Sequence, residues 1–315
     1  PIDITVGVRR VGEPEKRALY IDKHGAMLGV REGRFQVRVK EKGKWRVVAD
    51  VSPVEIDSVV VATRGASITA AAVELAAKYG IDLYLTIGMK PIARLTPAEY
   101  GSAMRTWVKQ LWAVSREEVR ARYAREFVRG KIYNQRMVLY GFWKTELAAG
   151  KKDQKLRRII DRIKEVEGQV DGAKTWKEAG SVESTAARLY WMGVRRLIPR
   201  ELGFRKRLKK WDLLPGEAPD PFNIALNIGY SVLTKEVWKA VFIANLNPYI
   251  GFLHARRPRR LSLVFDLMEE FRPIAVDRPI IKLARKDPKT IKQLSKKGTK
   301  EFDEVKKQIW RHILQ

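Results

Sequence analysis

Apolar and polar positions alternate over short runs in the first third of the chain, which is the pattern of β-strands. Residues 35–39 alternate strictly, as a half-buried strand does. An alanine-rich stretch over residues 67–79 interrupts the pattern and predicts a helix that Gly80 ends. Further strands are expected over residues 18–21, 26–30, 45–51, 58–62 and 81–87.

From about residue 96 the spacing of apolar residues becomes helical. Two long helices are expected over residues 103–130 and 131–149, and a third over residues 155–170. Pro91 and Pro97 bracket the expected linker between the two parts of the chain.

The rest of the chain, from residue 180, is expected to be helical with breaks near Pro199, residues 215–221 and Pro248. Its Lys-rich end, residues 282–307, predicts a solvated helix or a partly mobile basic tail. The pattern as a whole predicts a two-domain α+β chain. A small β-rich domain over residues 1–93 precedes a larger all-α domain over residues 94–315.

Composition narrows the class of function. The chain has 315 residues and no cysteine, which excludes disulfides, zinc–thiolate sites and thiol nucleophiles. Its formal net charge of +27 favours a polyanionic partner, and nucleic acid is the commonest one. No apolar run approaches the roughly 20 residues of a spanning helix, and the first residues lack a signal-peptide pattern. We therefore expect a cytoplasmic protein without a membrane partner.

Histidine is scarce, with His24, His254 and His312 the only three in the chain. His24 lies in an expected turn and His312 near the end, so neither is a candidate. His254 stands just before a dense basic loop. The arginines of this loop either hold phosphates around a site or form a solvated loop, and the sequence leaves both alternatives open. They are Arg256, Arg257, Arg259 and Arg260.

Asp266 and Glu269 are three residues apart, so on a helix both carboxylates project from one face. Their neighbours are apolar, and two carboxylates held close in apolar surroundings need a cation or protons between them. A divalent metal would satisfy both. The alternative is that Asp266 caps a helix and Glu269 pairs with Arg272, and the two interpretations have about equal weight.

Glu183 begins an otherwise apolar helical stripe, and Ser181 is the expected cap of that helix. The carboxylate either favours the positive end of the helix or reaches into a site, and periodicity does not decide between them. An imidazole with carboxylates suits Mn²⁺ or Mg²⁺ better than zinc.

Four segments together resemble one family. They are residues 183–191, 220–230, 251–254 and 263–273, and they resemble, in the same order, the CRISPR-associated endonuclease Cas1, the integrase of spacer acquisition. The β-rich first third and helical remainder also resemble that family, so the likeness covers nearly the whole chain. Ser184 stands where the family often has glycine, and serine is small enough to fit there.

The resemblance implies a role for each candidate. Glu183, His254 and Glu269 match the family's ligands of a divalent metal, Mg²⁺ or Mn²⁺. Asp266 matches the first acidic position of the pair, which the family needs for activity and which lies beside the metal. All four residues are therefore expected to be catalytic.

The resemblance also implies a reaction and partners. The 3′-hydroxyl of a short captured DNA duplex would attack a phosphodiester at the border of a CRISPR repeat, and water would replace the hydroxyl in cleavage. Expected partners are double-stranded DNA with free 3′ ends, CRISPR repeat DNA, a second copy of the chain joined through the β-rich domain, and the smaller protein Cas2. Two alternatives remain at this point: a metal-dependent nuclease of repair or recombination, and a nucleic-acid scaffold without catalysis.

Overall fold

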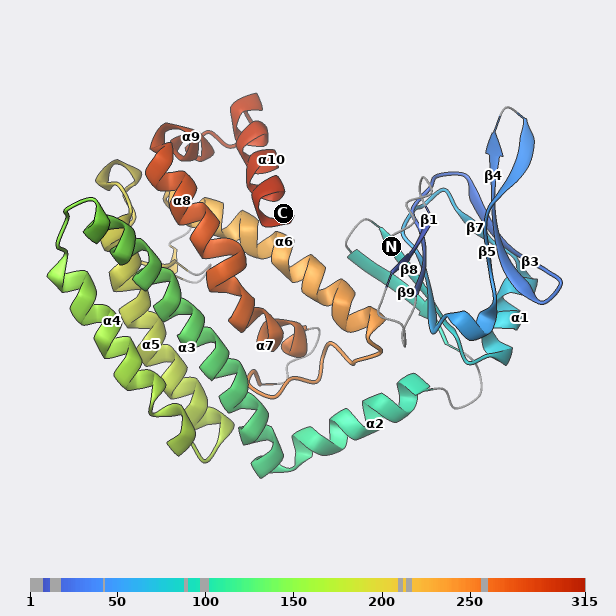
Figure 1. Ribbon diagram of the computed structural model, residues 1–315, viewed down its shortest axis with the longest axis horizontal. Coiled ribbons are helices and arrows are strands. Elements are labelled where there is room, and N and C mark those ends of the chain that lie inside the picture. The colour runs from blue at the N-terminus through green and yellow to red at the C-terminus, as the bar shows by residue number, and fades with distance from the viewer. Residues whose placement is uncertain are drawn as a thin grey trace. The chain divides into compact units, whose positions relative to one another are not determined.

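The computed structural model describes residues 8–11, 18–41, 43–87, 90–96, 102–208, 212–213, 217–255 and 260–314. By its internal contacts the chain forms two compact units. The first comprises Pro1–Leu111 and Trp238–Asn247, and the second comprises Trp112–Val237 and Pro248–Gln315. The strands of the first unit are drawn in blue to teal in Figure 1. The domain boundary expected between residues 93 and 94 stays a prediction.

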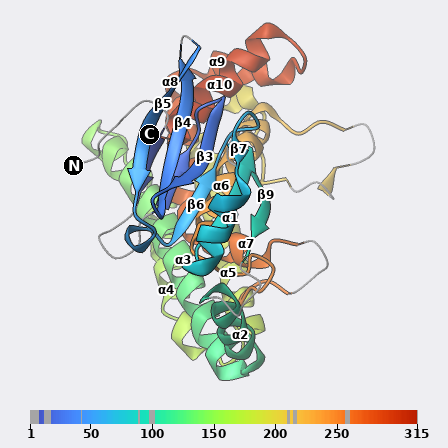
Figure 2. The same cartoon turned by 90° about the vertical axis from the view of Figure 1, so that its right-hand side faces the viewer.

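The first unit is built on two sheets. Five strands follow the order β1-β2-β6-β8-β9, and four follow the order β5-β4-β3-β7. Figure 2 shows β5, β4 and β3 side by side. The strands are β1 (Val8–Val11), β2 (Ala18–Ile21), β3 (Ala26–Arg31), β4 (Arg34–Glu41), β5 (Lys44–Val51), β6 (Ser58–Val61), β7 (Ser67–Ile68), β8 (Asp82–Ile87) and β9 (Lys90–Leu95).

The alternation along these strands produces one apolar core. Leu19, Leu28, Phe35 and Val59 are buried together in it. Helix α1 (Ala70–Lys78) adds its alanines to the same core. The side chain of Thr69 caps this helix by accepting a hydrogen bond from the N–H of Ala72. The strands and the helix predicted from the pattern are therefore present.

The linker predicted between Pro91 and Pro97 is wrong, because residues 90–95 form β9. This strand pairs antiparallel with β8 at the edge of its sheet, with a register shift at Leu85 and Thr86. An edge strand tolerates proline because one side of its backbone needs no partner. Pro97 lies outside the described residues.

The second unit is helical. Its helices are α2 (Ser102–Ser115), which crosses the division between the units, α3 (Glu117–Ala148), α4 (Gln154–Glu167), α5 (Trp176–Leu197), α6 (Pro221–Ile243), α7 (Ser262–Phe271), α8 (Arg278–Lys286), α9 (Pro288–Lys292) and α10 (Lys300–Leu314). A π-helix, η5 (Arg272–Asp277), joins α7 to α8. Short 3₁₀ turns include η1 (Pro53–Glu55), η2 (Val170–Gly172), η3 (Arg200–Leu202) and η6 (Gln293–Ser295). Figure 1 shows α3, α4 and α5 side by side.

Three helical predictions need correction. The break between the first two long helices lies at Arg116, not after Gly130, so Lys131 stands inside α3. Residues 282–307 are not a tail, because α9 and α10 bury apolar side chains such as Ile291 and Ile309. The third correction concerns the start of α5, where Ser181 is not the cap.

Helix α5 begins five residues before Ser181. The Thr175 hydroxyl accepts a hydrogen bond from the N–H of Glu178, and the Glu178 carboxylate accepts one from the N–H of Lys174. This pair satisfies the first turn of the helix, so Ser181 has no free N–H to cap. Glu183 therefore stands in the helix interior, where the positive helix end no longer accounts for its charge.

The last turns of α6 belong to the first unit. Phe242 and Ile243 pack against Tyr20, Val60 and Tyr84 on the outer face of the five-stranded sheet. The Tyr84 hydroxyl also contacts the amide oxygen of Asn245. Within the described part of the chain, no helix is long and apolar enough to cross a membrane.

Candidate active site

A pocket of about 740 Å³ in the helical unit gathers three of the four predicted site residues. Glu183 comes from α5, His254 from the loop after α6, and Glu269 from α7. The side chains of Glu183 and His254 are 20% and 25% exposed, and that of Glu269 is 4% exposed. Three separate segments therefore present acidic and imidazole groups to one space.

Asp266, the fourth predicted residue, is fully buried behind this pocket. Its Oδ2 accepts hydrogen bonds from the N–H of Phe252 at 2.5 Å and of Leu253 at 3.0 Å. Its Oδ1 accepts the N–H of His254 at 2.9 Å and lies 2.7 Å from the Nδ1 of the same residue. Asp266 therefore fixes the loop and the imidazole at once.

The arrangement of His254 leaves its other ring nitrogen available. Because the carboxylate of Asp266 is an acceptor, Nδ1 donates to it, and Nε2 carries the lone pair. Nε2 lies 4.0 Å from Oε1 of Glu269. An imidazole held by a carboxylate on one nitrogen and open at the other is the usual state of a metal-binding histidine.

Gly251 allows the loop to come this close to α7. A Cβ atom at this position would lie 2.6 Å from Oδ2 of Asp266 and 2.8 Å from the backbone of Ser262. Any larger residue would push the loop away from Asp266, and His254 with it.

Lys131 on α3 lies between the two acidic residues of the pocket. Its ammonium contacts the carboxylate of Glu183 and lies 2.5 Å from Oε2 of Glu269. Burial lowers the pKa of Lys131, but the charges of Glu269 and Glu183 outweigh this effect and raise the pKa overall. The buried acidic pair is therefore compensated by a cation of the chain itself.

Glu269 has a second cationic neighbour, Arg272, which contacts Oε1. Burial raises the pKa of the Glu269 carboxyl, but the charges of Arg272 and Lys131 outweigh it and lower the pKa to about 2. Glu269 is therefore ionised at neutral pH. The pairing with Arg272 that the sequence allowed as an alternative is present, and Asp266 caps no helix.

A buried network supports Arg272 from behind. Its guanidinium lies 5.3 Å from the ring centre of Tyr230, and that of Arg207 lies 5.1 Å from the same ring. The hydroxyls of Tyr230 and Tyr190 donate to Asp277 at 2.5 and 3.0 Å. Burial raises the pKa of Asp277 to about 6, although both hydrogen bonds act in the opposite direction.

The donor set fits a hard divalent ion. Two carboxylates and an imidazole with a free nitrogen are ligands that Mn²⁺ and Mg²⁺ accept. Oε2 of Glu269 is buried, and its charged neighbour at 2.5 Å is the ammonium of Lys131. In that same part of the chain, no group of three His, Asp or Glu side chains could hold an ion as they lie. Lys131 explains this, because its ammonium lies where these carboxylates converge.

Of the four arginines predicted near the site, Arg260 lines the pocket, with its guanidinium 5.8 Å from the ring centre of Phe265. Arg256, Arg257 and Arg259 lie outside the described residues.

The sequence reasoning missed three cations of the pocket: Lys131, Arg188 and Arg207. One signal could have found Lys131. It occupies a helical stripe whose other members, such as Phe127, Val128 and Gln135, are buried. A lysine in such a stripe needs a buried acid as partner.

Comparison with known proteins identifies the family. The profile of the family described as CRISPR associated protein Cas1 matches residues 19–309. The chain belongs to the Cas1 family. The family expected from the four motifs is therefore confirmed.

Curated relatives of this Cas1-family chain carry the same name. The CRISPR-associated endonuclease Cas1 1 of Saccharolobus solfataricus is 39% identical over 280 residues, which is 89% of this chain and 74% of the relative. The CRISPR-associated endonuclease Cas1 of Korarchaeum cryptofilum is 35% identical over 277 residues, covering 85% and 77%.

Solved structures share the fold of this Cas1-family chain. A casposase bound to integration product superposes with a TM-score of 0.73 at 23% identity, covering 94% of this chain and 86% of that one. A CAS1 protein from Thermotoga maritima has a TM-score of 0.69 at 19% identity, covering 97% and 88%. The predicted α+β architecture, β-rich first and helical after, is confirmed.

Proposed function

We propose that the chain is a metal-dependent DNA integrase and endonuclease of CRISPR spacer acquisition. It joins the 3′-hydroxyl ends of short captured DNA to a repeat array by phosphodiester transesterification. One observation carries the proposal: Glu183, His254 and Glu269 reach a single pocket from three separate segments. The names of the curated relatives and the integration product in the casposase structure support it.

Glu183, His254 and Glu269 would hold the divalent ion, Mg²⁺ or Mn²⁺. When bound, such an ion polarises a phosphoryl group and stabilises charge that develops on its oxygens. Asp266 keeps the proton of His254 on Nδ1, so that Nε2 stays free for the pocket. Arg188, Arg207 and Arg260 line the same space and can pair with phosphate oxygens of the substrate.

The proposed partners are DNA, Cas2 and a second copy of the chain. The net charge of +27 supports a DNA partner. Structures similar to this chain include a Cas1–DNA complex with a TM-score of 0.55 and a partial Cas6-RT-Cas1–Cas2 complex with a TM-score of 0.59. For the second copy we propose β5 as the contact, because this edge strand exposes Trp45 and Val47.

One observation favours a second candidate, a nucleic-acid scaffold without catalysis. Lys131 and Arg272 already compensate the acidic residues of the pocket, so the site is electrostatically balanced by the chain alone. In that case the acids would be structural, and the protein would bind DNA without changing it.

A joining assay separates the candidates. A short duplex with free 3′ ends is mixed with supercoiled plasmid in Mn²⁺ or in chelator. We expect covalent joining in Mn²⁺ only, and its loss in Glu183→Ala and His254→Ala with DNA affinity nearly unchanged. Glu270→Ala, one residue beyond Glu269 on α7, is the matched control and should join normally.

Each other outcome has a meaning. Metal-dependent cutting without joining would indicate a nuclease of repair or recombination. DNA binding without either reaction would indicate the scaffold. Full joining by Glu183→Ala or His254→Ala would refute the assignment of the site.

A further inference from the structure

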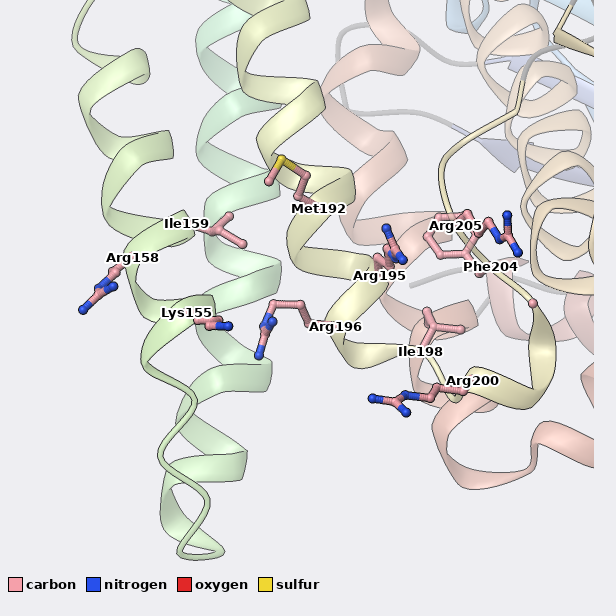
Figure 3. Close-up of a pocket in the computed structure, with 11 residues that line it drawn as sticks. Lys155, Arg158, Ile159, Met192, Arg195, Arg196, Ile198, Arg200, Phe204 and Arg205 are labelled. Atoms are coloured by element: carbon pink, nitrogen blue, oxygen red, sulfur yellow. The ribbon is translucent and has the colours of Figure 1, made fainter.

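A second pocket in the helical unit, of about 880 Å³, is rich in positive charge (Figure 3). Helix α4, helix α5 and the segment around η3 each contribute to it. Six exposed cationic side chains line it: Lys155, Arg158, Arg195, Arg196, Arg200 and Arg205. We call this space the arginine pocket.

Little negative charge compensates these cations. Arg196 pairs with Asp153 at 2.8 Å. Within the described ranges of the chain, none of the other five cations forms an ion pair with a carboxylate. Lys155 on α4 and Arg196 on α5 point toward one another, whereas Arg158 points outward at the rim (Figure 3). Like charges held together in this way repel one another unless a polyanion lies between them.

The walls of the arginine pocket also include apolar groups. Ile159, Ile198 and Phe204 line it together with Met192, which is 53% exposed. A ligand with both phosphates and apolar faces therefore suits the pocket better than a free inorganic anion. A nucleic-acid strand has this composition, because its charged backbone alternates with sugars and bases.

The arginine pocket adjoins the pocket of about 740 Å³ that contains Glu183, His254 and Glu269, which we call the active-site pocket. Helix α5 lines both, with Trp191 in the active-site pocket and Met192 in the arginine pocket. The ring of Trp191 lines the active-site pocket, and its centre lies 6.1 Å from that of Phe204, which lines the arginine pocket. Arg188 and Arg195, seven residues apart on α5, lie on nearly the same face and continue the positive charge from one pocket to the other.

We propose that the arginine pocket binds the backbone phosphates of the DNA strand that extends from the active-site pocket. Along α5, Arg195 lies twelve residues beyond Glu183, which is about 18 Å at roughly 1.5 Å per residue. One strand of a duplex carries a phosphate about every 3.4 Å of its axis, so the contacts fall about five phosphates from the reacting 3′ end. That register rests on the proposed function of the active site, whereas the phosphate binding itself does not.

The test removes three of the cations by Arg195→Ala, Arg200→Ala and Arg205→Ala in one chain. The control removes three exposed lysines of the same unit that line neither pocket, by Lys282→Ala, Lys292→Ala and Lys297→Ala. Binding of a labelled 30-base-pair duplex is measured against salt concentration in chelator, so that no reaction contributes. A third variant with lysine at the three arginine positions tests whether charge suffices.

We expect the arginine triple variant to bind about tenfold more weakly, with a salt slope reduced by about 2 to 3, since each phosphate contact contributes about 0.9. The lysine control should change much less, and the Arg→Lys variant should recover most of the affinity. Equal effects in the arginine variant and the control would overturn the proposal. Because all substituted residues are exposed, circular dichroism and thermal unfolding should be unchanged.

A second measurement tests the position of the contacts. Neutral methylphosphonate linkages are placed one at a time along the strand, counted from its 3′ end. In the unsubstituted chain, neutral linkages about five positions from the 3′ end should weaken binding, and in the arginine variant the same linkages should weaken binding no further. If the neutral linkages reduce the DNA affinity of the arginine variant as much as that of the unsubstituted chain, the proposed location is contradicted.

Pyrophosphate separates DNA from a small phosphate compound as ligand. Thermal stabilisation by millimolar pyrophosphate that disappears in the arginine variant, together with unchanged DNA binding, would assign the pocket to a small ligand and overturn the proposal. If the arginine variant loses DNA affinity as predicted but the unsubstituted chain joins no DNA in Mn²⁺, the proposed function alone is refuted.

Discussion

Lys131 is a buried cation whose ammonium lies between the carboxylates of Glu183 and Glu269. Removing one member of a buried ionic group leaves uncompensated charge, which is strongly destabilising. A divalent ion between the same carboxylates would supply that compensation instead. In the proposed metal-bound state, this ion would compete with Lys131 for the same oxygens.

The first prediction follows for Lys131→Met. Without metal, the free energy of unfolding should fall by about 2–4 kcal/mol, because two carboxylates then face each other. In excess Mn²⁺ the loss should shrink, since the ion stabilises the folded state only. Lys144→Met, on the exposed side of the same helix, should change stability by less than about 0.5 kcal/mol. Thermal unfolding of both variants, with and without Mn²⁺, tests this prediction. An equal loss of stability by Lys131→Met in both conditions would contradict the metal site.

The second prediction concerns Asp266→Asn. The amide would place an N–H₂ group against donors that now bind a carboxylate, so we expect a loss of about 2–4 kcal/mol in urea unfolding. Mn²⁺ affinity should fall by about 10- to 100-fold, because His254 loses its orientation. Glu270→Gln, four residues further along α7, serves as control. Unchanged Mn²⁺ affinity would show that Asp266 does not position the imidazole.

Local sequence was sufficient for some of these residues and not for others. Asp266 and Glu269 could be singled out as candidates because their spacing and apolar neighbours lie in one short segment, which left metal binding and a structural role equally weighted. The contact between Asp266 and His254 could not be predicted, because the sequence does not show that the loop twelve residues earlier folds back onto α7. Lys131 and Arg207 come from other segments, and in a chain with 63 lysines and arginines neither stands out.

At the scale of elements, the π-helix η5 and helix α6 hold a buried acid between two tyrosines. Asp277 ends η5, and Tyr230 on α6 donates to it. Gly229 permits this approach, because a Cβ there would lie 2.5 Å from Val276 and 2.9 Å from Ile313. The wider turns of a π-helix often occur beside functional sites, and here η5 follows directly after the helix of Glu269.

The third prediction is a pH dependence of stability caused by Asp277. Burial raises its folded pKa to about 6 from an ordinary value of 3.8, so the folded chain binds more protons between these values. The resulting stability is complete below about pH 4 and is lost as the pH rises through about 6. Between pH 4 and pH 7, the free energy of unfolding of the unsubstituted chain should fall by roughly 3 kcal/mol more than that of Asp277→Asn. Parallel curves for the two chains would contradict the raised pKa.

The fourth prediction concerns the packing of α6. Gly229→Ala should lower stability by about 1–3 kcal/mol in urea unfolding, because the methyl group meets buried side chains from two directions. Gly141→Ala, in α3 with nothing within 4 Å, is the control and should be neutral or stabilising. Equal stability of both variants would mean that the contacts around Gly229 relax freely.

Periodicity predicted most elements, and its errors have physical causes. Residues 90–95 contain Pro91 and were expected as a linker, yet an edge strand accepts a proline that an interior strand would not. The long helices were divided at Gly130, although a glycine inside a helix packed against Glu270 is tolerated. The end of the chain was expected to be a solvated helix or a partly mobile basic tail. Its many lysines outnumber the few buried apolar residues, such as Leu294, that pack these helices.

At the scale of the whole molecule, the order of four motifs identified the family, and no single element could have done so. The proposed second copy belongs to this scale as well. The exposed side chains of β5 were not visible as such in the sequence, since Trp45 and Val47 read there as ordinary members of a half-buried strand.

The fifth prediction tests that proposed contact. Trp45→Glu should shift the chain from dimer to monomer in gel filtration at micromolar concentration, because a charge on an apolar contact is costly to bury. Tyr79→Glu, at a similarly exposed aromatic residue of the same unit, should leave the elution volume unchanged. A monomer in the unchanged chain would contradict the dimer, and an unchanged dimer in Trp45→Glu would move the contact away from β5.

The most direct measurement is the binding of Mn²⁺ to the full chain in the absence of DNA, followed by calorimetry and electron paramagnetic resonance. We predict one ion per chain, and affinity at least about tenfold weaker in each of Glu183→Ala, His254→Ala and Glu269→Ala. Glu270→Ala should bind as the unchanged chain does. Mn²⁺ binding that is equally strong in all four variants, or no binding to a folded chain that still joins DNA, would contradict the assignment of the metal site to these three side chains.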